Sequence, residues 1–357
     1  MARYETGFED GRRLLRGKQE RLAYGLLAVA LVAAPWVLPA YHIGEATFIL
    51  IMCVASLGLM MLTGFTGQVS LGQSAFVGIG AYIHTILLTQ GVPLPVSLLL
   101  TTAGAALGGL LVGMPAIRVS GLHLAMVTMA FAIVCEHVIG RWKSVTAGHG
   151  GMAVPDPTLF GLSLGGPRAF YLLCLVVLAV VLILLVNLMR SATGRAFIGI
   201  RDSEAAAQGL GIDVARTKVL AFSLSAACSG LAGALLAHQM QHITPEAFGL
   251  ALSLQLVLMV FIGGLGSLRG AILGAILIGL LPSFISSLKE ALPARLGAQF
   301  GLELFVYGAV LTFFVLLEPG GLNSRWVRIR KVLAEFPWVR NSSVHKTKVY
   351  MKSERYR

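Results

Sequence analysis

The chain alternates long apolar runs with short polar stretches. A helix needs about 20 mainly apolar residues to cross the hydrocarbon core of a bilayer, and ten runs approach that length. They cover residues 22–40, 45–62, 69–89, 93–114, 121–139, 169–188, 218–240, 250–265, 268–287 and 303–318. The pattern predicts an all-α, polytopic membrane protein with about ten transmembrane helices.

The composition is that of an integral membrane protein. Hydrophobic residues make up 56% of the chain and charged residues only 12%, whereas soluble domains carry about 25% charged residues. The net charge of +12 therefore indicates cations at the surface of a lipid bilayer, and no nucleic-acid partner is expected. The cysteines lie inside apolar runs, without the spacing of a metal site or of a disulfide framework.

The distribution of positive charge predicts the orientation of the spans. With the N-terminus in the cytoplasm, 23 of the 28 Lys and Arg residues fall on the cytoplasmic side, as the positive-inside rule requires. Both termini are then cytoplasmic. The predicted organisation is a basic N-terminal tail (1–21), a membrane domain (22–318) and a basic C-terminal tail (319–357), with a long external loop at 140–168. That loop fits equally well a docking surface for an external partner and a plain connector.

The cytoplasmic loop at residues 189–218 is polar and basic. Its middle is typical of a short helix with small side chains, a shape suited to docking into another protein. We therefore expect this loop to receive force or a signal from a cytosolic partner. The residues concerned are Arg201, Asp202, Glu204, Ala205, Ala206, Gly209, Gly211 and Ile212.

Two stretches predict glycine-broken helices at membrane depth. Residues 64–73 place flexible backbone and neutral polar side chains where lipid disfavours them, and residues 263–270 form a second break. Such backbone is tolerated only when it is buried in protein or lines a watery cavity, and transporters use it to face a substrate. A translocation pathway and a structural kink are both open interpretations. The candidate pathway residues are Gly64, Thr66, Gln68, Ser70, Gln73, Gly264 and Ser267.

Glycines also recur at helical spacing inside the apolar runs. Pairs four residues apart occur at 104 and 108, at 109 and 113, and in a series at 266, 270 and 274. This spacing lets helix backbones approach each other closely in lipid. It favours close contacts within one bundle over a face that joins two chains.

The sequence carries no converging set of catalytic residues. It has no phosphate-cradling loop, so any ATP chemistry must come from another chain. Ionisable residues inside the runs are few, with His84, His123, Glu136 and His137 as the main examples, and they do not suffice for a proton relay across the membrane. We expect a non-enzymatic membrane subunit without a metal or cofactor.

Five stretches of the chain form a recognisable series. They are LTGFTGQVSLGQSAFVGIGAY (62–82), RVSGLHLAMVTMAF (118–131), TAGHGGM (146–152), GRAFIGIRDSEAAAQGLGI (194–212) and the segment 243–275. In this order they resemble the permease subunits of branched-chain amino acid ABC importers, the LivM family. The resemblance covers about residues 40 to 330.

The resemblance implies an all-helical, multi-pass permease of the bacterial inner membrane. It implies a second, homologous permease, two cytosolic ATP-binding subunits and a periplasmic substrate-binding protein as partners. Residues 201–212 match the family's loop that docks on an ATPase, and residues 64–82 would line or shape the translocation path.

Two departures from the family concern the substrate more than the class. Gln73 and Met60 stand where His and Asn are usual, and related permeases carry urea, amides, aromatic acids or sugars. A self-sufficient secondary transporter is the alternative from another class. Broken helices fit that alternative, whereas the docking loop and the shortage of deep carboxylates do not.

Overall fold

The computed structural model describes residues 18–117, 119, 121–159, 162–291, 308, 312, 321–326 and 329. The tenth predicted span, 303–318, lies almost entirely outside these residues, as do most of the two predicted tails. The count of ten spans and the side on which the termini lie therefore stay predictions.

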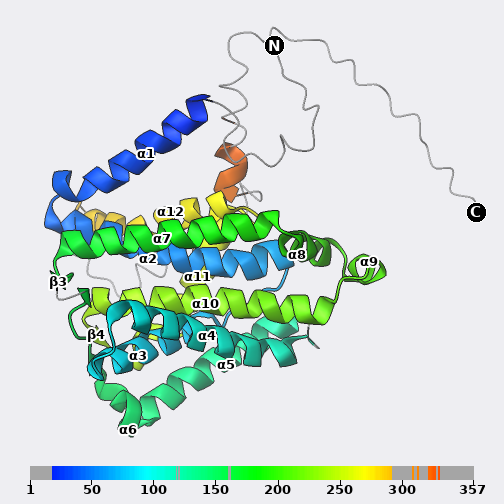
Figure 1. Ribbon diagram of the computed structural model, residues 1–357, viewed down its shortest axis with the longest axis horizontal. Coiled ribbons are helices and arrows are strands. Elements are labelled where there is room, and N and C mark those ends of the chain that lie inside the picture. The colour runs from blue at the N-terminus through cyan, green and yellow to red at the C-terminus, as the bar shows by residue number, and fades with distance from the viewer. Residues whose placement is uncertain are drawn as a thin grey trace, which may run out of the picture.

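The first nine predicted runs each correspond to a helix (Figure 1). These helices are α1 (Lys18–Val37), α2 (Ala40–Leu59), α3 (Gln73–Thr89), α4 (Leu94–Ala116), α5 (Leu122–Arg141), α7 (Pro167–Arg190), α10 (Val214–Met240), α11 (Leu250–Gly263) and α12 (Leu268–Ala291). Among the described residues, seven helical stretches are long and apolar enough to cross a membrane, and α1 and α3 contain shorter apolar stretches. The prediction of an all-α, multi-pass membrane protein is confirmed at this level.

The structure differs from the prediction at the first helix break. The second predicted run ends at residue 62, but the helix continues as a π-helical turn, η2 (Met60–Phe65), and α3 begins only at Gln73. Gly67 has a left-handed φ of 73°, a conformation that glycine adopts without steric cost. The chain between η2 and α3 therefore leaves the helical path, within the stretch 64–73 where the sequence predicts a break.

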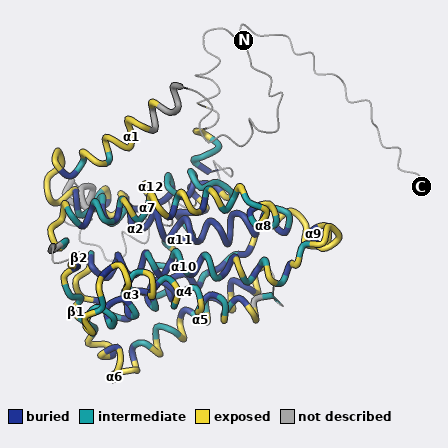
Figure 2. Tube along the Cα trace, in the orientation of Figure 1, coloured by how far each residue is buried: buried dark blue, intermediate teal, exposed yellow. Residues whose placement is uncertain are grey.

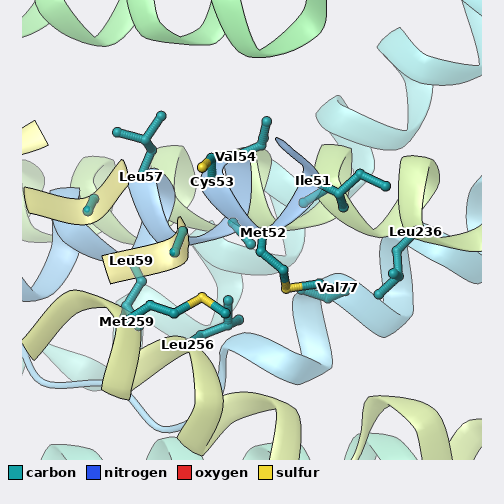
Figure 3. Packing of buried hydrophobic residues seen from close by; sticks show 14 of the residues in the cluster. Ile51, Met52, Cys53, Val54, Leu57, Leu59, Val77, Leu236, Leu256 and Met259 are labelled. Atoms are coloured by element: carbon teal, nitrogen blue, oxygen red, sulfur yellow. The ribbon is translucent and has the colours of Figure 1, made fainter. Parts of the chain in front are cut away.

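Helix α2 and its η2 extension form the centre of the bundle. Every residue from 50 to 66 is buried, and Figure 2 shows this segment in dark blue between α7 and α10. In Figure 3, Met52 lies beside Val77 of α3, and Leu59 lies beside Met259 of α11. Because lipid tails are as apolar as these side chains, close van der Waals contact stabilises this core more than exclusion of water does.

Glycines allow α10 to lie directly against its neighbours. A side chain at Gly233 would overlap the backbone carbonyl of Val77 in α3, and one at Gly80 would overlap Gly230. Between α11 and α12, Gly270 lies against the backbone of the facing helix in the same way. The close approach predicted from the glycine spacing at 266, 270 and 274 is thus found inside one bundle.

The two ends of the bundle carry different structures (Figure 1). At one end lie α8 (Ala192–Asp202) and α9 (Glu204–Gly209). At the other end lie α6 (Lys143–Thr146), η3 (Gly148–Gly150), β1 (Met152–Ala153), β2 (Thr158–Leu159), β3 (Leu162–Ser163), β4 (His242–Ile243) and η4 (Pro245–Phe248).

Short strands tie the predicted external loop to the chain that follows α10. β1 pairs antiparallel with β4, with Met152 opposite Ile243, and β2 pairs antiparallel with β3. His149 Nδ1 also lies 2.6 Å from Glu246 Oε1. Strands of two residues show no alternating pattern, so the sequence does not predict this small exception to an all-α fold.

Candidate functional site

The first helix break is closed by its own polar groups. Thr66 Oγ1 donates a hydrogen bond to the Leu62 carbonyl at 2.5 Å, and the backbone N–H of Gln68 donates to the same carbonyl at 3.1 Å. Thr63 Oγ1 donates to the Gln68 carbonyl at 3.2 Å. Backbone groups freed at a helix end must find partners inside the protein when no water is near. In this conformation, hydrogen bonds among residues 62–68 therefore hold the first break in a defined shape.

Hydroxyl groups from two other helices bind the start of α3. The Leu71 amide donates to Thr128 Oγ1 of α5 at 3.0 Å, and the Ser74 amide donates to Ser253 Oγ of α11 at 2.9 Å. Ser253 thereby satisfies one of the amides that the first turn of a helix leaves without partners, and Thr128 binds the chain just before that turn. Sequence reasoning missed Thr128 and Ser253, because a single hydroxyl inside an apolar run gives no pattern.

Gln73 joins α3 to α10. Its Nε2 donates to Ser225 Oγ at 2.9 Å, and Ser229 Oγ donates to its Oε1 at 2.7 Å. All three residues are fully buried. Gln73 was predicted as a pathway residue, and in this conformation its amide is occupied by the helix contact.

Replacing Gln73 with leucine should lower the free energy of unfolding by about 1 kcal/mol, since the two serine hydroxyls lose their partner. Adding Ser225→Ala and Ser229→Ala should recover most of that loss, because no unpaired hydroxyl then remains. Thermal unfolding of the single and triple variants in the same detergent measures both effects. A triple variant less stable than the single variant would contradict this account.

Gln68 contrasts with Gln73. Its side chain is only 6% exposed, yet neither its Oε1 nor its Nε2 has a hydrogen-bond partner among the described residues. A buried amide left unpaired costs about 1–3 kcal/mol. Of the predicted pathway residues, Gln68 therefore has a buried side-chain amide whose donor and acceptor are free to form further hydrogen bonds.

The second helix break lies directly against the first. Gly264 and Gly266, between α11 and α12, have left-handed φ values of 105° and 77°. A Cβ added at Gly64 would lie 2.8 Å from the amide nitrogen of Gly266. Ser267 Oγ accepts a hydrogen bond from the Gly270 amide at 3.2 Å and thereby supports the first turn of α12. The structure thus brings the two breaks into contact at Gly64 and Gly266, and the role of the candidate residues as a pathway stays a prediction.

Helices α8 and α9 form a capped turn before α10. Ser203 Oγ accepts a hydrogen bond from the Ala206 amide at 3.3 Å and caps α9. Asp213 Oδ1 accepts from the Arg216 amide at 3.0 Å and caps α10. Side-chain caps of this kind stabilise helix ends by about 1 kcal/mol, so the turn has a defined shape.

The α8–α9 turn has an apolar inner side and a small-residue outer side. The inner side is a cluster of Ile200, Ala207, Val214 and the half-buried Ile212. The outer side exposes Glu204, Ala205, Ala206, Gly209, Leu210 and Gly211. Of the predicted docking residues, Ile212 thus belongs to the support of the turn, whereas Glu204 to Ala206 and the two glycines lie at the surface.

An ion pair fixes α9 to α10. Lys218 Nζ lies 2.7 Å from Glu204 Oε1, and the lysine side chain is only 5% exposed whereas that of the glutamate is 49% exposed. Lys218 is one of the cations of the predicted cytoplasmic loop, and the structure shows it buried. A buried ammonium group is stable only with a partner, so Glu204 has a structural function besides its place on the surface.

The family of the chain follows from the region that holds both breaks and the α8–α9 turn. Residues 43–315 match the sequence profile described as Branched-chain amino acid transport system / permease component. The chain belongs to this permease family. Membership indicates a non-catalytic transmembrane subunit.

Three relatives of the permease illustrate the similarity. It is 32% identical over 275 residues to the high-affinity branched-chain amino acid transport system permease protein LivM of Salmonella typhimurium, covering 70% of this chain and 64% of the relative. LivM of Escherichia coli is also 32% identical, over 279 residues, with the same coverage. The autoinducer 2 import system permease protein LsrC of an Enterobacter species is 31% identical over 225 residues, 62% of each chain.

The permease spans less than two-thirds of the length of these relatives: 64% of LivM and 62% of LsrC are matched. No solved structure matches the chain.

The permease also contains a buried histidine pair at the end of α10 away from α9. His84 Nε2 of α3 lies 2.9 Å from His238 Nε2 of α10, and Ser97 Oγ of α4 lies 2.7 Å from His84 Nδ1. One of the two Nε2 atoms must carry the hydrogen that joins them. The sequence singles out His84 but not its partners, because they lie on other helices. These contacts join three helices at one end of the bundle.

Proposed function

We propose that the chain is a transmembrane subunit of an ATP-driven ABC importer that moves branched-chain or related amino acids across the bacterial inner membrane. The observation that carries the proposal is the α8–α9 turn. It is a capped surface of small residues, and it lies next to the two helix breaks of the bundle. The family profile over residues 43–315 supports the same function.

The complete importer would contain a second, homologous permease, two cytosolic ATP-binding subunits and a periplasmic substrate-binding protein. The exposed Ala205, Ala206 and Gly209 would enter a groove on an ATP-binding subunit, because small side chains let two surfaces approach closely. The Lys218–Glu204 pair would pass a movement of α9 into α10.

Transport would proceed by alternating access. Hydrogen bonds at the start of α3, including those of Gln73 to α10, would hold one conformation of the bundle. ATP binding and hydrolysis in the partner subunits would move α9 and favour the other conformation. Substrate selection would rest mostly on the binding protein, because the sequence shows no obvious set of ligand-binding residues.

A different substrate within the same transporter class is the second candidate. The similarity to LsrC, an autoinducer 2 import permease, favours it, because that level of identity is almost as high as the identity to LivM. Urea, amides and aromatic acids are further candidates. A self-sufficient secondary transporter is the remaining alternative and makes a different prediction about partners.

The test is purification of the tagged chain from native membranes in mild detergent, followed by mass spectrometry of the proteins that accompany it. We expect a similar permease and an ATP-binding subunit, and ATP-dependent leucine uptake after reconstitution with the binding protein. Recovery of the chain alone, with uptake driven by an ion gradient, would replace the proposal by the secondary transporter.

Gly209 offers a matched pair of variants for the docking surface. No atom lies within 4 Å of a Cβ added there, so a larger side chain fits without disturbing the fold of the chain. Gly209→Trp should nevertheless prevent recovery of the ATP-binding subunit and abolish uptake, whereas Gly209→Ala should retain both. Normal recovery and uptake with the tryptophan variant would place the docking surface elsewhere.

A further inference from the structure

Arg201 in the last turn of α8 has a side chain that is 38% exposed, but its guanidinium group reaches the first helix break. Its Nη1 donates a hydrogen bond to the Gly64 carbonyl at 3.2 Å. Its Nε and Nη2 donate to Asp202 Oδ1 at 3.2 and 3.1 Å. The guanidinium group is therefore oriented from two sides, by a neighbour in α8 and by a backbone group of the first break.

Glycines from both breaks lie against this side chain. A Cβ added at Gly67 would lie 3.2 Å from Arg201 Cγ, and one added at Gly266 would lie 2.8 Å from Arg201 Nη1. Any other residue at Gly266 would push the guanidinium group aside. The absence of side chains at these two positions therefore makes room for Arg201 between the breaks.

The position of Arg201 also has an electrostatic basis. The η2 extension of α2 ends at Phe65 and α11 ends at Gly263, just before the two breaks. The last carbonyls of a helix lack partners and carry partial negative charge, so a cation stabilises them. Arg201 binds such a carbonyl of the first helix and lies beside the chain that leaves the second.

We propose that Arg201 is a positioning residue that transmits a movement of α9 to both helix breaks at once. The inference rests on the proposed function, in which an ATP-binding subunit moves α9. α8 ends at Asp202, and α9 begins at Glu204, with only the capping residue Ser203 between them. A rotation of α9 therefore displaces the end of α8. Arg201 is bonded to Gly64 and lies against Gly67 and Gly266, so its displacement alters both breaks together.

Three variants test this role. Arg201→Met keeps an unbranched side chain but removes the charge and all donors. Arg201→Lys keeps the charge but not the planar arrangement of donors. Arg216→Met is the matched control, since it makes the same substitution at an arginine whose side chain is 90% exposed and pairs with Asp213 away from the breaks.

The measurement is leucine uptake per ATP hydrolysed by the reconstituted importer, with the wild-type complex established by the copurification described above. Arg201→Met should retain the ATP-binding subunits and hydrolyse ATP, but uptake per ATP should fall by at least about tenfold, as expected for loss of a bond to a charged group. Arg201→Lys should show an intermediate loss. Arg216→Met should stay within about twofold of the wild type, because an exposed ion pair contributes little.

Two results would overturn the inference. Arg201→Met with the wild-type uptake per ATP would show that the breaks respond to ATP without this side chain. Arg201→Met that no longer copurifies with the ATP-binding subunits would assign Arg201 to docking. Failure of the proposed function itself is distinguishable, because it appears in the wild-type chain as the absence of an ATP-binding partner.

Discussion

Replacing Gly233 with valine is expected to reduce the yield of folded protein to a small fraction of the wild-type yield. A Cβ at this position of α10 would overlap the backbone carbonyl oxygen of Val77 in α3, and it would also lie 3.1 Å from the Ala81 amide nitrogen. Backbone atoms cannot rotate away as a flexible side chain can, so the two helices must separate. We expect a loss of about 3 kcal/mol or more in the free energy of unfolding.

The matched control is Gly25→Val. Gly25 is also a helical glycine in an apolar stretch, but no atom lies within 4 Å of a Cβ added there. Its stability should stay within about 0.5 kcal/mol of the wild type. Size-exclusion profiles in detergent and thermal unfolding compare the two variants, and equal yields of folded protein would refute the close contact between α10 and α3.

Reversing the charge at Glu204 should strongly reduce transport while the chain still inserts into the membrane. Glu204→Arg leaves the buried ammonium group of Lys218 without its partner and places a second cation beside it. Breaking a buried ion pair costs about 3–5 kcal/mol, and the half-exposed position of Glu204 reduces the expected loss to about 2 kcal/mol. α9 should then leave its place on α10, and uptake should fall at least about tenfold, one factor of ten for each 1.4 kcal/mol.

Exchanging the two charges distinguishes the role of Glu204 in the ion pair from its role on the docking surface. In the double variant Glu204→Arg with Lys218→Glu, the attraction between α9 and α10 returns with the charges exchanged. Its thermal stability should exceed that of Glu204→Arg alone, and the difference gives the coupling energy of the pair. Uptake by the single variant at the wild-type rate would mean that the position of α9 does not depend on this pair.

The elements that the sequence predicts well are those with strong local signals. Nine helices follow from apolar runs, because every backbone group in lipid must bond within its own segment and a helix must be long enough to cross. The exposed turn at Ala205, Ala206 and Gly209 follows from a polar stretch between two such runs. Both signals are contained in the residues of the element itself.

The polar contacts of the site depend on residues far apart in the sequence. Thr128 and Ser253 each occur as a single hydroxyl in an apolar run, and Ser225 is one of three serines in another. Only the helix arrangement brings them to the start of α3. The positive-inside rule assigns Arg201 and Lys218 to one side of the membrane, but it does not predict which residues their side chains contact. The structure places one of them against the two breaks and buries the other beneath α9.

The central position of α2 has a consequence for the biosynthesis of the protein. This helix is made early, but a Cβ at its Gly58 would lie 2.7 Å from Cys228 Cβ of α10, a helix that leaves the ribosome much later. Membrane helices insert first and associate afterwards, so the face of α2 at Gly58 stays uncovered by α10 until α10 has been made. Chains truncated before Val214 are therefore expected to be degraded faster than the full chain.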